Sequence, residues 1–333
     1  MKNSNVIRST EIPSPDSVAE LLVRYQLDLQ AANRSQKTIN WYLYILNHYF
    51  DFLESNSLLK PVSELGRKEL REYVRFLQHT RRWLNNPHIK DQSKGLSPYS
   101  IQGHVRAIKT FWTWLANEGI IESNLLAKFP LPKVPQYVIR TLTPRQISQL
   151  LSAIEKSTAL GYKYYCIILL LVDAGIRISE LINIKVNDVD IQGGFVTILG
   201  KGQKQRVVPI SRITRKEILR YRDRFGKGNG AIGSLYLFTD KYGGPVTANS
   251  IQQYLRRLAK KADLGDIRVT PHIFRHTVAT HAATQGTNAF ILKEIMGHSS
   301  MQTTMRDIHP QPTDLKAQHN IFSMVNELFR NNI

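Results

Sequence analysis

The sequence predicts a two-domain protein that is mainly α-helical and contains one small β-sheet. Its 333 residues correspond to two domains at roughly 100–200 residues per domain. Apolar residues recur at helical spacing over most of the chain. One pair of short strand-like runs, 195–199 and 206–210, flanks a glycine-rich turn and is expected to form a hairpin.

The first half predicts a polar arm followed by a helical domain. Residues 1–16 are polar, contain Pro13 and Pro15, and are expected to form a flexible N-terminal arm. Residues 17–128 are expected to form the first domain. Its helices are predicted after Ser17, after Ser35, over Val62–Gln78 and over Pro98–Glu118.

Two polar or proline-rich segments interrupt the helical pattern. Segment 81–98 is polar and rich in helix breakers, so a loop is expected there. The stretch 129–144 carries four prolines, a composition typical of a semi-rigid linker. We therefore assign the linker to 129–140, with the domain boundary near residue 138.

The helices that follow Ser35 and Ser97 resemble each other in their apolar positions, for example Ile39 with Ile101. Each begins with a serine that can cap a helix. Two amphipathic helices with a common core pattern would explain this match. A bundle that presents both helix starts to one ligand would explain it too. In that case four residues near the helix starts would contact phosphate: Lys37, Thr38, Ser100 and Gln102.

The second domain, 141–333, is also expected to be mainly helical. Thr143 and Pro144 form a helix start that resembles a capping box. A buried helix over about 162–173 is predicted to end at Gly175. Further helices are predicted over 212–224, 247–262, 271–284, 288–296 and 312–329.

The charge balance indicates a polyanionic partner. The chain has 45 Lys and Arg against 26 Asp and Glu, a net charge of +19. Residues 1–140 hold 19 basic and 12 acidic residues (+7), and the remaining 26 and 14 give +12. Because both halves are basic, contact with a polyanion along the whole length is expected. A merely basic soluble protein is the plain alternative.

Other classes of protein are disfavoured. The single cysteine, Cys166, excludes an intramolecular disulfide and a cysteine-cluster zinc site, which fits a reducing cytosol. The N-terminus lacks the apolar region of a signal peptide. The longest apolar run, 166–172, is too short to span a membrane, and no polybasic amphipathic helix is evident.

The segment AGIRISEL (174–181) contains the first candidate for chemistry. It places Arg177 on a short helix with Glu180 three residues later, so Glu180 is the expected partner of the arginine. A solvated surface pair of the same residues would have the same sequence pattern.

The segment GKGQKQR (200–206) offers Lys201, Lys204 and Arg206 at the predicted hairpin turn. It is not a P-loop, because no Ser or Thr follows its Gly-Lys pair and no helix succeeds it. A solvated basic turn is again the plain alternative.

The segment TPHIFRHTVATHA (270–282) begins a helix with His272 and Arg275 near its start, where one phosphate could bind. His272 and His276 at i and i+4 would permit a metal pair. However, no catalytic glutamate lies between them and an arginine does, so no metal is predicted.

In the segment 296–310, Gly297 can end a helix and leave His298 at its exit. Taken alone, a histidine at a helix exit is more often a residue that makes a structural hydrogen bond.

Together, these four segments resemble the tyrosine recombinase, or phage integrase, superfamily. AGIRISEL resembles the segment with the first catalytic arginine, and GKGQKQRVVP the family's β-hairpin with its lysine. HIFRHTVAT resembles the His-x-x-Arg box, and MGHSSMQTTM the Leu-Gly-His box. The resemblance covers most of the chain. It implies an N-terminal helical, SAM-like core-binding domain and an α+β catalytic domain.

The resemblance also implies roles for the matching residues. Arg177 and Arg275 would hold the non-bridging oxygens of the scissile phosphate, a task that suits the guanidinium fork. Lys201 would protonate the departing 5′-oxygen as general acid. His272 would assist proton transfer at the nucleophile, and His298 would hydrogen-bond the phosphate. No metal or other cofactor is implied, and Lys204 and Arg206 are expected to contact DNA.

One position departs from the family pattern. The nucleophilic tyrosine lies nine residues beyond the histidine of the Leu-Gly-His box, and that count from His298 gives Asp307. No tyrosine follows Tyr254. Attack by a carboxylate would give a labile acyl phosphate, and an ionised aspartate would repel a phosphate. The sequence therefore predicts a cleavage-deficient chain, whether Asp307 is natural or engineered.

The predicted function is site-specific recombination or integration of a mobile element, with 3′-phosphotyrosyl chemistry in the family. The chief alternative is a non-catalytic DNA-binding or synapsis-regulating homologue, and a third is a nuclease or topoisomerase-like relaxer. The expected partners are a double-stranded DNA recombination site and further copies of the chain. Dimers to tetramers would form on DNA through the helix at 312–329. The expected location is the prokaryotic cytoplasm, at the nucleoid.

Overall fold

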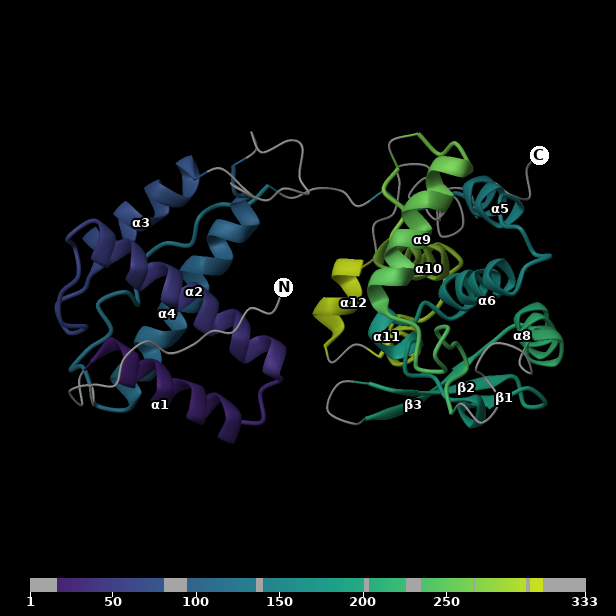
Figure 1. The fold of residues 1–333 in the computed structure, drawn as a ribbon, viewed down its shortest axis with the longest axis horizontal. Coiled ribbons are helices and arrows are strands. Elements are labelled where there is room, and N and C mark those ends of the chain that lie inside the picture. The colour runs from purple at the N-terminus through teal and green to yellow at the C-terminus, as the bar shows by residue number, and fades with distance from the viewer. Residues whose placement is uncertain are drawn as a thin grey trace, which may run out of the picture. The chain divides into compact units, whose positions relative to one another are not determined.

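The chain forms two compact units, residues 1–136 and 137–333, which we call the N-terminal and the C-terminal unit. The computed structural model describes residues 17–80, 95–135, 140–200, 204–225, 235–265, 267–297 and 300–307, with only the backbone at 305–307. The division between the units falls inside the segment 129–140. Figure 1 colours the N-terminal unit purple to blue and the C-terminal unit teal to yellow.

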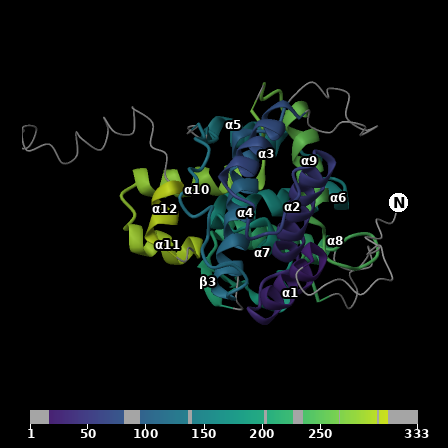
Figure 2. The ribbon, with the colours of Figure 1, turned by 90° about the vertical axis from the view of Figure 1, so that its left-hand side faces the viewer.

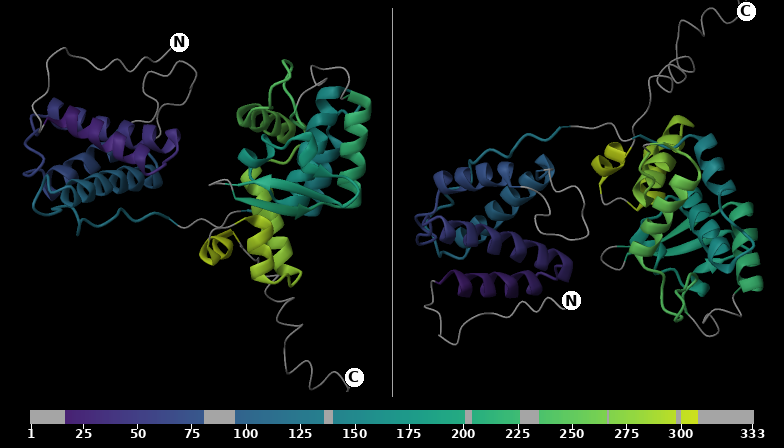
Figure 3. Two further views of the ribbon diagram at one scale, coloured as in Figure 1. Left: turned by 90° about the horizontal axis from the view of Figure 1, so that it is seen from below. Right: turned by 45° about the horizontal axis from the view of Figure 1, so that its top comes forward.

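The described residues of the N-terminal unit form four helices, which Figure 3 shows from two sides: α1 (Val18–Ala31), α2 (Gln36–Ser55), α3 (Arg67–His79) and α4 (Pro98–Asn117). Ser35 and Ser97 cap α2 and α4 as predicted, because each hydroxyl accepts a backbone N–H three residues further on. The apolar faces of the helices meet in one aromatic core, in which Tyr49, Phe111 and Trp112 are fully buried.

Helix α3 begins five residues later than predicted. The Glu69 carboxylate accepts the backbone N–H of Gly66 (3.0 Å), which fixes the helix start after that glycine. Val62 and Leu65 precede the helix, in and next to a turn, and their side chains are buried there.

The chain that leaves α4 runs back along the same helix. Three α4 side chains donate to backbone carbonyls of this segment: Lys109 to Phe129 (2.7 Å), Gln102 to Pro132 (2.9 Å) and Tyr99 to Pro135 (2.5 Å). The donors are seven and three residues apart and therefore share one helix face. The first half of the predicted linker is thus held on α4.

The C-terminal unit combines a small sheet with helices, which confirms the predicted fold class. The sheet is antiparallel with the order β1-β2-β3 (Val189–Asp190, Phe195–Leu199, Gln205–Pro209), so β3 is an edge strand. Its helices are α5 (Pro144–Ser152), α6 (Ala159–Ala174), α7 (Ile178–Leu181), α8 (Arg212–Phe225), α9 (Ala248–Lys261), α10 (Pro271–Thr284), α11 (Ala289–Met296) and α12 (Met301–Asp307), with a 3-10 turn over Val186–Asp188.

Helix α6 forms the centre of this unit, packed between α8 and α10. Gly175 ends α6 in the left-handed conformation (φ 58°), as predicted. A Cβ atom there would lie 3.0 Å from the Met296 sulfur and 3.1 Å from Val278. Glycine therefore allows the close approach of the segments that carry the candidate site.

Helices α10, α11 and α12 lie together in the C-terminal unit (Figure 2), and α11 also contacts the edge strand β3. This packing brings the end of α11 near the turn between α6 and α7. Neither α12 nor β1 was predicted, and the helix predicted over 312–329 lies outside the described residues. No helix in the described part of the chain is long and apolar enough to cross a membrane.

Candidate functional site

Arg177 is the N-cap residue of α7, two residues after the glycine that ends α6. Its backbone N–H and its Nη1 both donate to the Glu180 carboxylate (2.9 Å each), which confirms the predicted pairing. Its Nη2 donates to the backbone carbonyl of Gly297 (2.9 Å). With 32% of its side chain exposed, Arg177 still reaches the surface.

Glu180 is buried and pairs with a second arginine. Arg206 on β3 donates from Nη1 to Glu180 Oε1 (2.9 Å) and from Nη2 to Oε2 (2.8 Å). Burial by itself raises the pKa of the Glu180 carboxyl. The hydrogen bonds from Arg206 and Arg177 outweigh burial and hold the pKa below its ordinary value. The carboxylate therefore stays ionised as the counterion of both guanidinium groups.

Arg275 bridges two helix ends from the second turn of α10. Its Nη1 donates to the carbonyl of Gly175 (2.8 Å) and its Nη2 to that of Met296 (2.6 Å). Thr270 caps α10 as predicted. His272, three residues before Arg275, is exposed, whereas Arg275 is buried. The spacing of three residues predicts that the two side chains share one face of α10, but only the Arg275 side chain is buried.

Arg177 and Arg275 converge on the turn that ends α11. Gly297 closes this helix in the left-handed conformation (φ 63°), and the two arginines hold the neighbouring carbonyls of Met296 and Gly297. His298 follows this turn directly in the sequence. The structure thus brings together two of the residues that the sequence predicts for the phosphate site.

Three other predicted site residues lie wholly or partly outside the described residues. Lys201 and His298 lie outside the described residues. Asp307 is the last residue of α12, and its side chain is likewise outside the description. Lys204 is exposed near the hairpin turn, where its carbonyl accepts the N–H of Gly200 (2.8 Å).

The structure assigns Arg206 a different environment from the DNA contact that the sequence suggested. Its guanidinium is largely buried against Glu180 and also donates from Nε to the carbonyl of Ile295 (3.0 Å). Strand alternation was the signal that could have shown this. Val208 points into the core, so Arg206 two residues before it faces the same way, whereas Val207 is exposed.

The predicted DNA contacts of the N-terminal unit lie at two helix starts. Lys37 is exposed in the first turn of α2. The hydroxyls of Thr38 and Ser100 pair with those of the capping serines (2.8 and 2.9 Å). The amide of Gln102 is bonded to the linker carbonyl of Pro132. Of the four side chains, Lys37 is thus the one that the structure leaves most open to a phosphate.

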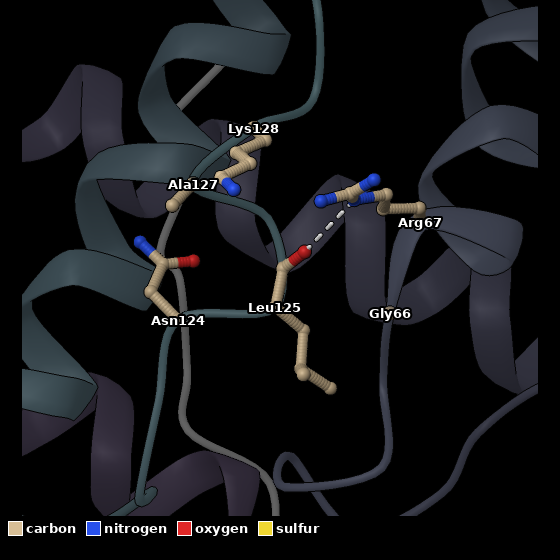
Figure 4. A pocket seen from close by; sticks show the side chains of 6 residues that line it. All are labelled: Gly66, Arg67, Asn124, Leu125, Ala127 and Lys128. Carbon is tan, nitrogen blue, oxygen red and sulfur yellow. Dashed lines mark hydrogen bonds between the residues drawn. The ribbon is translucent and has the colours of Figure 1, made fainter.

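An open hollow of about 500 Å³ marks the surface of the N-terminal unit between the start of α3 and the turn after α4. Figure 4 shows Arg67 reaching across it to donate to the carbonyl of Leu125 (3.3 Å), with Lys128 on its rim. Among the described residues, no group of three or more His, Cys, Asp or Glu side chains could hold a metal ion.

A comparison with known families defines the class of protein to which this two-unit fold belongs. The model of the phage integrase family matches residues 140–313, more than half of the chain. The chain belongs to the phage integrase family and is, by family, a tyrosine-type DNA recombinase.

A curated relative agrees with this assignment, and two solved structures share the fold. The tyrosine recombinase XerC of Anoxybacillus flavithermus is 29% identical over 283 residues, which cover 83% of this chain and 88% of the relative. The chain is similar in fold to the Tn1549 transposon integrase in complex with transposon right end DNA, with a TM-score of 0.68, 22% identity and coverage of 91% and 99%. It is also similar to the site-specific recombinase XerH bound to its palindromic difH substrate, with a TM-score of 0.67, 19% identity and coverage of 92% and 85%.

Proposed function

We propose that the chain is a site-specific DNA recombinase or integrase of a mobile element, whose present sequence binds its site but is deficient in cleavage. The core-binding unit (17–128) and the catalytic unit (141–333) would grip one DNA duplex. The observation that carries the proposal is the convergence of Arg177 and Arg275 on the turn that precedes His298. Two guanidinium groups on one turn suit the charge of a phosphodiester in its transition state.

In the proposed reaction, a nucleophile at position 307 attacks the scissile phosphate. A tyrosine hydroxyl there would form a 3′-phosphotyrosyl bond while the bond from phosphorus to the 5′-oxygen breaks. Lys201 would protonate that departing oxygen as general acid, which gives a free 5′-hydroxyl. His272 would assist the loss of the hydroxyl proton, and His298 would hydrogen-bond the phosphate. Asp307 cannot form the durable ester, so this chain would bind without accumulating a covalent complex.

The proposal is tested with Asp307→Tyr and its matched control Asp307→Phe, which differ by one hydroxyl. A suicide substrate that loses a short strand after cleavage traps the covalent complex on a denaturing gel. We expect a complex with D307Y and none with D307F or the unmodified chain. A covalent complex of the unmodified chain would mean that Asp307 or another residue supplies the nucleophile.

The second candidate function is a DNA-binding regulator of synapsis without any cleavage. The aspartate at the nucleophile position, in an otherwise matching segment, favours this candidate. It requires that D307Y, with specific binding retained, forms no covalent complex. In either case we propose double-stranded DNA and further copies of the chain as partners, with assembly through the helix predicted over 312–329.

A further inference from the structure

The last turn of α11 is held by three arginines on three successive carbonyls. Arg206 Nε donates to Ile295 (3.0 Å), Arg275 Nη2 to Met296 (2.6 Å) and Arg177 Nη2 to Gly297 (2.9 Å). The last carbonyls of a helix have no partner within the helix and lie at its negative end, so cations stabilise them. The turn beside the proposed phosphate site is thus held by a third arginine, which comes from strand β3.

Arg206 is packed too tightly into this turn to act as a surface contact. A Cβ atom on Gly297 would lie 2.6 Å from Arg206 Nη1 and 2.7 Å from Cζ. Glycine is therefore required at 297 for two reasons: its positive φ and the guanidinium against it. Only 13% of the Arg206 side chain is exposed.

Glu180 links Arg206 to Arg177. Each carboxylate oxygen accepts one hydrogen bond from Arg206 and one from Arg177, counting the backbone N–H of Arg177. Loss of Arg206 would leave a buried carboxylate with half of its partners and a helix end without one of its donors. The position of Arg177 depends on that carboxylate.

We propose that Arg206 is a positioning residue of the cleavage site and not a DNA contact. It fixes Glu180, and through it Arg177, and it fixes the turn 295–297 from which His298 emerges. This inference rests on the proposed function, because the cleavage step is what the positioning serves. The phosphate itself would be held by Arg177 and Arg275.

The test compares Arg206→Gln with two other variants in the full chain carrying Asp307→Tyr. Arg220→Gln is the matched control, because Arg220 also pairs with a glutamate (2.8 Å to Glu217) but keeps an exposed guanidinium. Lys204→Gln removes the nearest exposed cation that is predicted to contact DNA. For each variant, the single-turnover cleavage rate at saturating DNA and the salt dependence of single-site binding are measured.

For R206Q we expect the cleavage rate to fall at least tenfold while the dissociation constant stays within about threefold and the salt slope is unchanged. K204Q should instead weaken binding and reduce the salt slope by about one. R220Q should match the parent. Arg206→Lys keeps the charge but loses the fork, so an intermediate rate is expected. A double variant with Glu180→Gln should lose no more than the worse single variant, since both act through one pair.

Two outcomes would overturn the inference. One is an R206Q cleavage rate within about twofold of the parent rate. The other is a loss of DNA affinity and of salt slope in R206Q like that of K204Q. If the parent D307Y forms no covalent complex, the proposed function fails. In that case amide hydrogen exchange, measured without the D307Y change, tests whether Arg206 positions the turn. R206Q should then speed amide exchange severalfold in 175–181 and 289–297, and unchanged exchange there would contradict the positioning role.

Discussion

At the residue scale, the most unusual polar feature of the N-terminal unit is a partly buried relay between three helices. His48 Nδ1 lies 2.7 Å from Tyr73 Oη, which lies 2.9 Å from His104 Nδ1. The phenol can donate to one histidine and accept from the other, so both hydrogen bonds can form when one Nδ1 carries a proton and the other does not. Burial lowers the pKa of His48, and burial together with His48 lowers that of His104 to about 4.

We therefore predict that the N-terminal unit loses stability as the pH falls from 6.5 to about 4. In this pH window His104 binds a proton in the unfolded chain but stays neutral in the folded one, so acid favours unfolding. For His104 the loss is about 2 kcal/mol at pH 4.5 relative to pH 7. All four tryptophans lie at or before position 114, so intrinsic fluorescence during urea unfolding reports on this unit alone.

The control for this prediction uses two histidine replacements. His104→Gln should flatten the fall in unfolding free energy by about that amount. His79→Gln, at an exposed position on α3, is the control for replacing a histidine outside the relay. Parallel profiles of H104Q and the unmodified chain would show that the relay does not couple stability to pH.

The two arginines of the proposed phosphate site should differ in what their loss does to the fold. With D307Y in place, Arg177→Ala and Arg275→Ala should each abolish cleavage and leave single-site binding within a few-fold. R275A should also lower the unfolding free energy by about 1–3 kcal/mol, because it leaves two carbonyls without a donor. Single-turnover assays and urea unfolding measure the two effects. Cleavage within about tenfold of the parent would contradict the phosphate role.

At this scale the sequence was informative where a local rule applied. The pair of Arg177 with Glu180 followed from helical spacing, and the ends of α6 and α11 followed from glycine. The second partner of Glu180 comes from a strand 26 residues away, so no local rule indicated it. Arg206 alternates with the exposed Val207 and shares a strand face with the buried Val208, which indicates an inward side chain. The basic charge of the turn suggested a DNA contact instead.

At the scale of elements, the helices with a capping residue and an apolar face were predictable. Helix α12 was missed although Ser300 caps it, and so was strand β1. Helix α12 has the sequence MQTTMRD, which is too short and polar to show a helical period. Strand β1 has two residues and is defined by its pairing with β2. Both depend on tertiary contacts that a single sequence does not display.

The linker segment on α4 gives a prediction at this scale. Tyr99→Phe combined with Gln102→Ala removes two of the three hydrogen bonds that hold the segment 129–135. We expect trypsin to cleave after Lys133 severalfold faster, since a freed segment fits a protease better. Thr110→Ala, which removes an exposed α4 hydroxyl bonded only locally, is the control. Equal trypsin cleavage rates for the double variant and the unmodified chain would mean that the bond from Lys109 alone holds the segment on α4.

At the scale of the whole molecule, the charge of +19 is divided between both units. We predict that affinity for duplex DNA falls about a hundredfold or more between 50 and 200 mM salt, because each neutralised phosphate releases counterions. Gel shift or fluorescence anisotropy on a single site measures this. A nearly flat salt dependence would contradict a two-unit grip on the phosphate backbone.

The apolar stripe near the chain end suggests how copies assemble. It is formed by residues at i, i+3, i+4, i+7 and i+8: Ile321, Met324, Val325, Leu328 and Phe329. From its two prolines, the preceding sequence His309-Pro310-Gln311-Pro312 is predicted to form a stiff, non-helical joint that would project the predicted helix outward. Donation of such a helix from each copy to the next closes a ring only when every subunit both gives and receives.

We predict that removal of 312–333 leaves single-site binding within a few-fold but weakens the pairing of two bound sites at least tenfold. Native gel shift on one-site and two-site DNA, with light scattering for the mass of the complex, separates these effects. Met324→Ser with Leu328→Ser should reproduce the truncation, because both residues lie on the stripe, whereas Asn326→Ser, off the stripe, should not. If truncation instead unfolds the C-terminal unit and abolishes single-site binding, the helix packs on its own chain. In that case assembly must use another surface.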